Sequence, residues 1–341
     1  MRRMGRQRMV MGMLAALLLL AGCGTTTEGG SGAGGNSGSG DPVTIALSPW
    51  PGWYMWYVVQ EKGFFEKHGV DVKLEFFPVY SDSLQALATG KVDANSQTLS
   101  DTLAPLSKGI KLKAVLVNDN SHGGDAIVSR PEYDTIPDLR GKTVATELGT
   151  VDHLLLLTAL DQHGMTEKDI NFVNMTVNDA GPAFIAGNTD ASVLWEPFQT
   201  KAVNEGQGKV LFSSADVPGL IPDLLVFQEK VVEERPEDIQ KIVDAWFEGL
   251  AYFEENRDEM MELLAKQAET TPEDFALGIE SIRLFSIEDN LAAFQPGDSY
   301  TSLSYTAEKT AEFLHGLGMV DAMDDFESFL EPRFVQAAGS E

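Results

Sequence analysis

Three tryptophans, Trp50, Trp53 and Trp56, stand within one stretch of seven residues, in a turn that also contains proline and glycine. The turn follows the apolar run 43–47, which we predict as a strand, and precedes 57–63, which we predict as a helix. In an open α/β sheet, ligands bind at the carboxyl ends of strands. Trp50 and Trp53 flank the turn and are therefore candidates for ligand contact, whereas Trp56 is explained equally well as a core residue.

Acidic side chains accompany aromatic ones at the other predicted strand ends. Neither Lys nor Arg occurs in the segments that follow these strands, which are 48–56, 78–83, 94–101, 118–125, 147–153 and 195–198. Rings beside carboxylates suit a small cation or polar nitrogen compound of guanidine, amine or urea type, through cation–π attraction and charge-assisted hydrogen bonds. We predict the following ligand-binding residues: Trp50, Trp53, Tyr80, Asp82, Ser96, Asp119, Asp125, Thr150, Asp152, Trp195 and Glu196.

An anionic ligand is the alternative. The predicted helix N-termini at 81–83 and 149–152 present N–H groups that bind an anion without help from Lys or Arg. An aliphatic sulfonate, taurine or nitrate would fit such a site. Some of the carboxylates, Asp82 and Asp152 among them, are also well placed as helix caps.

The chain of 341 residues carries a formal net charge of −27. Such a surface repels nucleic acid and anionic lipid, so we predict neither as an electrostatic partner. The length that remains after the N-terminal segments suffices for roughly two domains.

The N-terminus has the pattern of a secretory signal. Arginines precede an apolar run, 9–20, that is too short to span a bilayer. The run ends in Leu-Ala-Gly before Cys23, which resembles a bacterial lipobox and implies lipid attachment to Cys23. We predict a signal peptide over 1–22, and a flexible Gly/Ser-rich tether over 23–41 that holds the protein at a membrane through the lipid.

Strand and helix patterns alternate along the body, which predicts the α/β class. We predict strands at 43–47, 70–77, 92–94, 113–117, 126–128, 142–146, 171–174, 190–198, 210–212 and 224–227. We predict helices at 57–63, 84–89, 99–106, 153–160, 183–186, 236–256, 257–267, 272–284 and 305–317, and a loop over 118–125.

Four motifs in order resemble a known family: EKGFFEKHGVDVKLEFF (61–77), ALATGKVDA (86–94), DLRGKTVATELGTVDHLLLLTAL (138–160) and DASVLWEPF (190–198). They resemble the substrate-binding proteins of ABC importers, in the nitrate/sulfonate/taurine subgroup that includes thiamine-precursor binders.

The resemblance implies a two-lobed fold of the periplasmic-binding-protein type (type II), with a mixed sheet flanked by helices in each lobe. Lobe one would comprise 42–122 and 223–341, lobe two 123–222, with two hinge crossings between them. The ligand would bind in the cleft, and the partners would be an ABC permease with its ATPase. We expect a monomer in the cell envelope, on the outer face of the cytoplasmic membrane or in the periplasm.

The sequence offers little for catalysis. Its five histidines lack a metal-ligand spacing such as H-E-x-x-H, no G-x-S-x-G turn occurs, and the only cysteine is in the predicted anchor. We therefore predict a binding protein without catalytic residues, metal or cofactor. Binding or synthesis of a thiamine pyrimidine precursor is a distant alternative.

Overall fold

The computed structural model describes residues 41–340. The predicted signal peptide, the predicted lipidation site Cys23 and the predicted tether up to residue 40 lie outside these residues. Between residues 41 and 340, no helix has both the length and the apolar content that a membrane span requires.

The first sheet has the strand order β11-β4-β10-β3-β1-β2. Its strands are β1 (Val43–Leu47), β2 (Val72–Phe76), β3 (Ala94–Thr98), β4 (Leu112–Ser121), β10 (Pro222–Gln228) and β11 (Ile282–Leu284). Strand β1 pairs in parallel with β2 and β3, while β10 runs antiparallel between β3 and β4. The carboxyl ends of β1, β3 and β4 therefore lie at the same edge of the sheet as the start of β10.

The second sheet has the order β7-β6-β8-β5-β9. Its strands are β5 (Asp125–Ser129), β6 (Thr143–Thr146), β7 (Asn171–Asn174), β8 (Ala191–Trp195) and β9 (Lys209–Ser213). Strand β5 is antiparallel to β8, so the first residue of β5 lies opposite the last residue of β8. The chain passes between the two sheets at 122–124 and again at 214–221.

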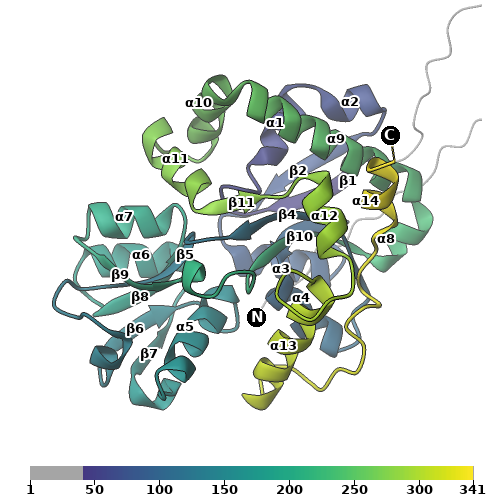
Figure 1. Ribbon diagram of the computed structural model, residues 1–341. Helices are drawn as coiled ribbons and strands as arrows, with labels where there is room; N and C mark the ends of the chain where they lie inside the picture. Colours follow the sequence, from purple (N-terminus) through teal and green to yellow (C-terminus); the bar gives the residue numbers. More distant parts are fainter. Residues whose placement is uncertain (1–40, 341) are drawn as a thin grey trace, which may run out of the picture. The chain divides into compact units, whose positions relative to one another are not determined.

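Helices cover both faces of each sheet. Figure 1 shows α3 (Tyr80–Ala88) and α4 (Leu99–Ser107) on one side of the first sheet, with α1 (Met55–Glu61) and α9 (Pro236–Glu255) on the other. In the second sheet, α5 (Val151–Gln162), α6 (Val177–Ile185) and α7 (Phe198–Asn204) all contact β8. The remaining helices are α2 (Phe64–His68), α8 (Glu229–Glu234), α10 (Arg257–Gln267), α11 (Pro272–Glu280), α12 (Ile287–Ala293), α13 (Leu303–Gly316) and α14 (Arg333–Ala338).

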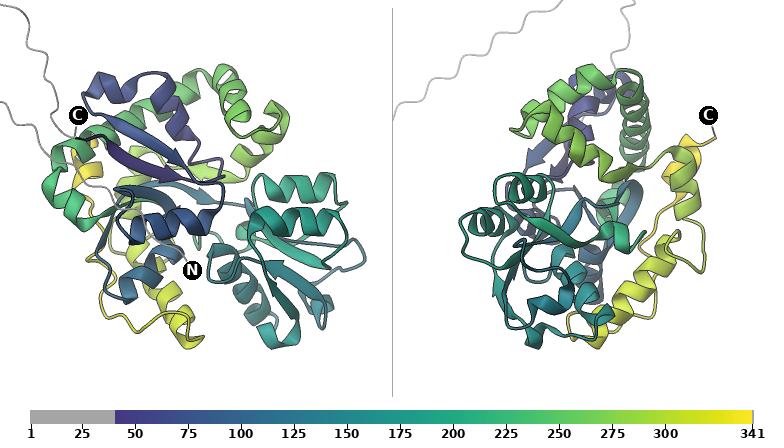
Figure 2. Two further views of the ribbon diagram at one scale, coloured as in Figure 1. Left: turned by 180° about the vertical axis from the view of Figure 1, so that it is seen from behind. Right: turned by 60° about the vertical axis from the view of Figure 1, so that its left-hand side comes forward.

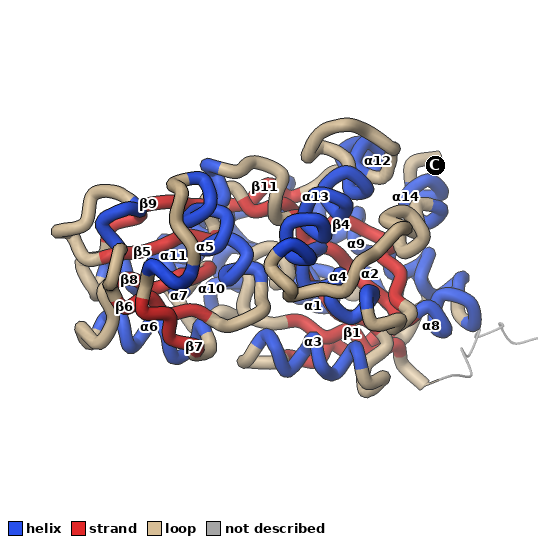
Figure 3. Tube along the Cα trace, turned by 90° about the horizontal axis from the view of Figure 1, so that it is seen from below, coloured by secondary structure: helices blue, strands red, loops and turns tan. Residues whose placement is uncertain are grey.

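Seen from behind, the two sheets form separate groups with their own helices (Figure 2). The view from below shows the same separation of the strands (Figure 3). Two mixed sheets flanked by helices confirm the predicted α/β fold.

The first sheet has a core made largely of aliphatic strand residues and of aromatic residues from the helices above it. Trp56 in α1 is fully buried, and its ring lies 4.4 Å from that of Trp246 and 6.1 Å from that of Phe65. Its Nε1 donates a hydrogen bond of 2.9 Å to Ser96 Oγ. Trp56 is therefore a core residue.

Several predicted boundaries differ from the structure, and two of them were wrong for the same reason. The predicted loop 118–125 is largely strand, because β4 continues to Ser121 where β10 and β11 pair with it. The helix predicted over 272–284 ends at Glu280, and the following residues form β11. In both cases pairing with strands distant in the sequence outweighs local preference, which no pattern within the segment reveals.

Candidate functional site

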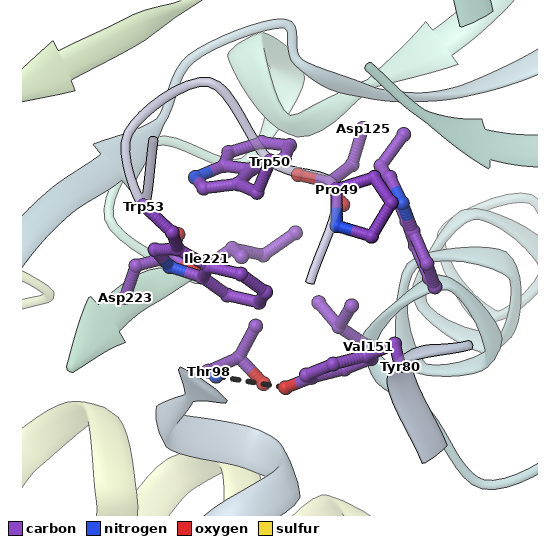
Figure 4. Close-up of a pocket in the computed structure, with 10 residues that line it drawn as sticks. Pro49, Trp50, Trp53, Tyr80, Thr98, Asp125, Val151, Ile221 and Asp223 are labelled. Carbon is purple, nitrogen blue, oxygen red and sulfur yellow. Dashed lines mark hydrogen bonds between the residues drawn. The ribbon is translucent and has the colours of Figure 1, made fainter. Parts of the chain in front are cut away.

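A small pocket lies where strand ends from the two sheets meet. Figure 4 shows its lining residues, which are Pro49, Trp50, Trp53, Tyr80, Thr98, Asp125, Val151, Trp195, Ile221 and Asp223. The cavity has a volume of about 10 Å³, close to the least that holds one water molecule. The walls therefore lie close together in this conformation.

Aromatic rings form one wall. The centroids of Trp50 and Trp53 are 6.2 Å apart, and those of Trp53 and Tyr80 are 5.3 Å apart. Trp195 meets Tyr80 edge to face at 5.5 Å, which extends the row of rings from the first sheet to the second. The Nε1 atoms of Trp53 and Trp195 are buried and make no hydrogen bond in the described part of the chain. A buried indole N–H without a partner is a donor that a bound solute would satisfy.

A hydrogen bond to a carboxyl group fixes the turn that carries Trp50. Trp50 Nε1 donates a hydrogen bond of 2.9 Å to Asp119 Oδ1 at the end of β4. Gly52 permits this close approach, because a Cβ atom at this position would lie 1.9 Å from Asp119 Oδ2. At the crossing, a Cβ atom on Gly124 would lie 2.7 Å from the Trp50 ring. The position of Trp50 thus depends on two glycines.

We expect Gly52→Ala to destabilise the fold by about 1–3 kcal/mol, because the new methyl group forces the turn away from Asp119. Urea unfolding followed by tryptophan fluorescence measures this difference. Gly316→Ala is the matched control, since nothing lies within 4 Å of a Cβ at that position of α13, and helical Gly→Ala is neutral or stabilising. Equal midpoints for Gly52→Ala and the unmodified protein would contradict the close contact.

Two carboxyl groups face the pocket, one from each sheet. Asp125 at the start of β5 is 2% exposed, and Asp223 in β10 is 1% exposed. Burial raises the pKa of Asp125 to about 6 and raises that of Asp223 well above its usual range. No lining residue is Lys, Arg or His, so no basic side chain of the wall offsets these acids.

A third carboxyl group lies at the back of the aromatic wall. Asp101 Oδ2 accepts hydrogen bonds from Thr98 Oγ1 at 2.9 Å and from Val151 N at 3.3 Å. The phenol of Tyr80 lies near this carboxyl, and its oxygen accepts a hydrogen bond from Thr98 N at 3.0 Å. Burial raises the pKa of Asp101 to about 7 in spite of these bonds. This carboxyl therefore already occupies the N-terminus of α5.

The structure brings together five of the eleven predicted ligand-binding residues in the wall of the pocket. These are Trp50, Trp53, Tyr80, Asp125 and Trp195. Asp119 and Asp152 are fully buried one step behind the wall, against Asp223 and Asp125 respectively.

The remaining four lie elsewhere. Asp82 is exposed on α3. Ser96 binds Trp56 in the core, and Thr150 Oγ1 donates to the Glu147 carbonyl at 2.9 Å. Glu196 accepts hydrogen bonds from Thr200 N and Oγ1 at 3.2 and 2.8 Å, and burial raises its pKa to about 7.

Sequence reasoning missed five lining residues: Pro49, Thr98, Val151, Ile221 and Asp223. Asp223 carries a charge in an otherwise apolar strand, which is a signal that the sequence does contain. Its register opposite Asp119 identifies it as part of the site, and that register is visible only in the fold. His153, by contrast, pairs with Glu167 at 2.7 Å and does not line the pocket.

Among residues 41–340, no group of three or more His, Cys, Asp or Glu side chains is arranged to hold a metal ion. The buried aspartates near the pocket therefore do not form a metal coordination shell. The pocket thus offers aromatic faces, indole donors and carboxyl groups for an organic solute.

Two α/β sheets with a pocket at their facing strand ends define a protein of the periplasmic-binding type. The chain matches the model of the NMT1/THI5-like family over residues 50–260 and belongs to that family. The family resemblance seen in the sequence motifs is therefore confirmed.

Several proteins are similar in sequence. Putative binding proteins from Brucella species are 26% identical over 61% of this chain, which spans 66% of their length. A putative aliphatic sulfonates-binding protein from Bacillus subtilis is 24% identical, over 96% of this chain and 95% of that protein. The taurine-binding periplasmic protein of Escherichia coli is 26% identical, over 80% of this chain and 86% of that protein.

The fold is shared with solved structures. The alkanesulfonate-binding protein SsuA from Xanthomonas axonopodis pv. citri, bound to MOPS, superposes with a TM-score of 0.73 at 17% identity. The match covers 85% of this chain and 98% of that one. These relatives are named for binding, in agreement with the prediction of a binding protein, and their names support the predicted anion alternative better than the cationic ligand, which they do not confirm.

Proposed function

We propose that this protein is the solute-binding component of an ABC importer in the cell envelope, and that its solute is a small organic cation such as guanidinium or a primary ammonium. The observation that carries the cationic ligand is the composition of the pocket wall. Asp125, Asp223 and four aromatic rings line it, and no Lys, Arg or His does. The cation would lie against the rings and donate hydrogen bonds to the two carboxylates.

The N-terminus of α5, where an anion would bind, is already occupied, and this supports a cationic ligand. Val151 N, at the start of α5, already donates to the Asp101 carboxyl. Asp152 follows in the first turn of the same helix and is fully buried. A sulfonate at this helix end would therefore have to displace the Asp101 carboxyl from Val151 N, which disfavours it.

An aliphatic sulfonate or taurine is the second candidate, because the named relatives bind such compounds according to their names. The unpaired Nε1 donors of Trp53 and Trp195 favour it within the pocket, since they would hydrogen bond to sulfonate oxygens. Taurine combines both features, because it carries an ammonium group together with its sulfonate.

We further propose how the chain works in transport. The segments 122–124 and 214–222 would act as hinges between lobe one (42–122 and 223–341) and lobe two (123–222), and closure would trap the solute. A permease with its ATPase would receive the closed form, while lipid on Cys23 would keep the monomer near the membrane.

The experiment is thermal unfolding of the purified protein with guanidinium, ethylammonium, taurine, isethionate and nitrate at low concentration, against matched sodium chloride. A solute that binds only the folded form adds about 2.7 kcal/mol of stability at a hundredfold excess over its Kd. We expect guanidinium or ethylammonium to raise the Tm. Taurine and isethionate share the sulfonate and differ in the ammonium group, so stabilisation by taurine alone also indicates recognition of the nitrogen.

A different pattern would overturn the cationic ligand. If isethionate and taurine raise the Tm equally while both simple cations have no effect, the sulfonate is the recognised group. The importer role would stand and the second candidate would replace the first. Stabilisation by nitrate alone would likewise point to an anion site.

A further inference from the structure

The acids at the pocket are arranged as two pairs. Asp125 lies beside Asp152, and Asp223 lies opposite Asp119 in the register of β10 and β4. In each pair one carboxyl lines the pocket while its partner is buried behind it. One pair belongs to the second sheet and its helix α5, the other to neighbouring strands of the first sheet.

The surroundings of these pairs favour a proton shared within each one. A carboxylate has no hydrogen to donate, so two buried carboxyl groups side by side hydrogen bond to one another only when one of them is protonated. In the described chain no N–H or O–H group reaches either oxygen of Asp152, Oδ2 of Asp119 or Oδ2 of Asp223. The neighbouring carboxyl is the partner that remains for Asp152 and for Asp223.

The surrounding groups do not supply a compensating charge. Asp125 also faces Ser121 from β4 and Glu196 from the end of β8. Asp152 faces Glu147 and Asp101, and Asp223 faces Asp101 together with the phenol of Tyr80. Every charged group among these is acidic, so a bound proton is the available counter-charge when no cationic solute is present.

We propose that binding of a cationic solute releases protons from these two aspartate pairs to the solvent, about one for each positive charge that enters the pocket. This inference rests on the proposed cationic ligand. N–H groups of the solute donate to Asp125 and Asp223 and replace the shared proton in the hydrogen bonding. The O–H bond breaks, the proton passes to the buffer, and the carboxylate that remains is neutralised by the solute.

Calorimetric titration with guanidinium chloride, and separately with ethylammonium chloride, tests the exchange. At a fixed pH of about 7 the titration is repeated in buffers of different ionisation enthalpy, and the slope of the observed heat against that enthalpy counts the protons. We expect release of about one proton per bound cation, together with a Kd that falls about tenfold for each unit of rising pH.

The outcomes separate this inference from the function on which it rests. Saturable binding with a slope of zero and a Kd independent of pH would overturn the proton release and leave the cationic ligand standing. Absence of binding by either cation would overturn both proposals.

A variant locates the protons. In the double variant Asp119→Asn and Asp152→Asn, each new amide donates an N–H to the pocket carboxyl in place of the shared proton. We expect the proton count of this variant to fall from about one to near zero. Asp325→Asn is the control, since this acid is exposed and remote in sequence from the pairs, and it should keep the full count. Unchanged proton release by the double variant would exclude the pairs as the source.

Discussion

Asp125→Asn is expected to weaken the binding of a cationic solute by about thirtyfold or more, while the solute-free protein stays at least as stable as before. Loss of one member of a buried, hydrogen-bonded charge pair typically costs about 2–5 kcal/mol of binding. In the free protein the same substitution relieves repulsion, because Asp125 lies near Asp119, Asp152 and Asp223. The new amide is also able to donate to Asp152, which no other donor reaches.

Calorimetry gives the affinity and urea unfolding the stability. Asp161→Asn is the matched control, because it makes the same chemical change at an exposed position near the end of α5. A cation affinity within threefold of the unmodified protein would show that Asp125 does not contact the solute. Loss of affinity together with a large loss of stability would instead indicate a structural role.

The second large effect is on stability as a function of pH. Burial raises the pKa of Asp125 to about 6, of Asp101 and Glu196 to about 7, and of Asp119 to about 8. Each group binds its proton more tightly in the folded protein than in the unfolded chain. Stability is therefore greatest while these acids are protonated and falls as the pH rises through their folded pKa values.

We expect the free energy of unfolding without solute to be smaller at pH 8 than at pH 5. Asp101 alone accounts for about 3 kcal/mol, at 1.36 kcal/mol for each of roughly two pH units. Surface acids with lowered pKa, such as Asp138 and Asp169, act in the opposite direction below this range. Urea titrations at the two pH values measure the difference, and equal stability at both would contradict the raised pKa values.

The sequence revealed the class of fold because local signals and tertiary structure agree at most elements. The run 43–47 is apolar except for Thr44 and forms the inner strand β1, and a turn with proline and glycine follows it. The part of β4 from Asn118 to Ser121 was misread, because its polar residues are stabilised by partners in β10 and β11. Nothing near them in the sequence indicates those partners.

The site residues that could be predicted are those that belong to the site because they lie at the end of a strand. Trp50, Trp53 and Tyr80 follow strand ends, Trp195 is the last residue of β8, and strand ends of this kind converge. The pairing of Asp119 with Asp223 depends on the register of two antiparallel strands separated by about a hundred residues. The Ser96 side chain lies on the face of β3 that points toward Trp56 and not toward the pocket. Side chains alternate between the two faces of a strand, so an error of one residue in the assumed register is enough to assign Ser96 to the wrong face.

The route of the chain through the two sheets also has a consequence for the order in which the molecule forms. The second sheet is assembled entirely from the segment 125–213, whereas the first needs β10 at Pro222–Gln228 and β11 at Ile282–Leu284 between or beside strands made much earlier. A further bridge joins Ala114 to Leu330, near the end of the chain. During synthesis the second sheet has all its strands while the first still lacks its central one, and contacts so distant in sequence form slowly. The incomplete first sheet therefore leaves β3 and β4 with open edges until the ribosome has passed residue 228.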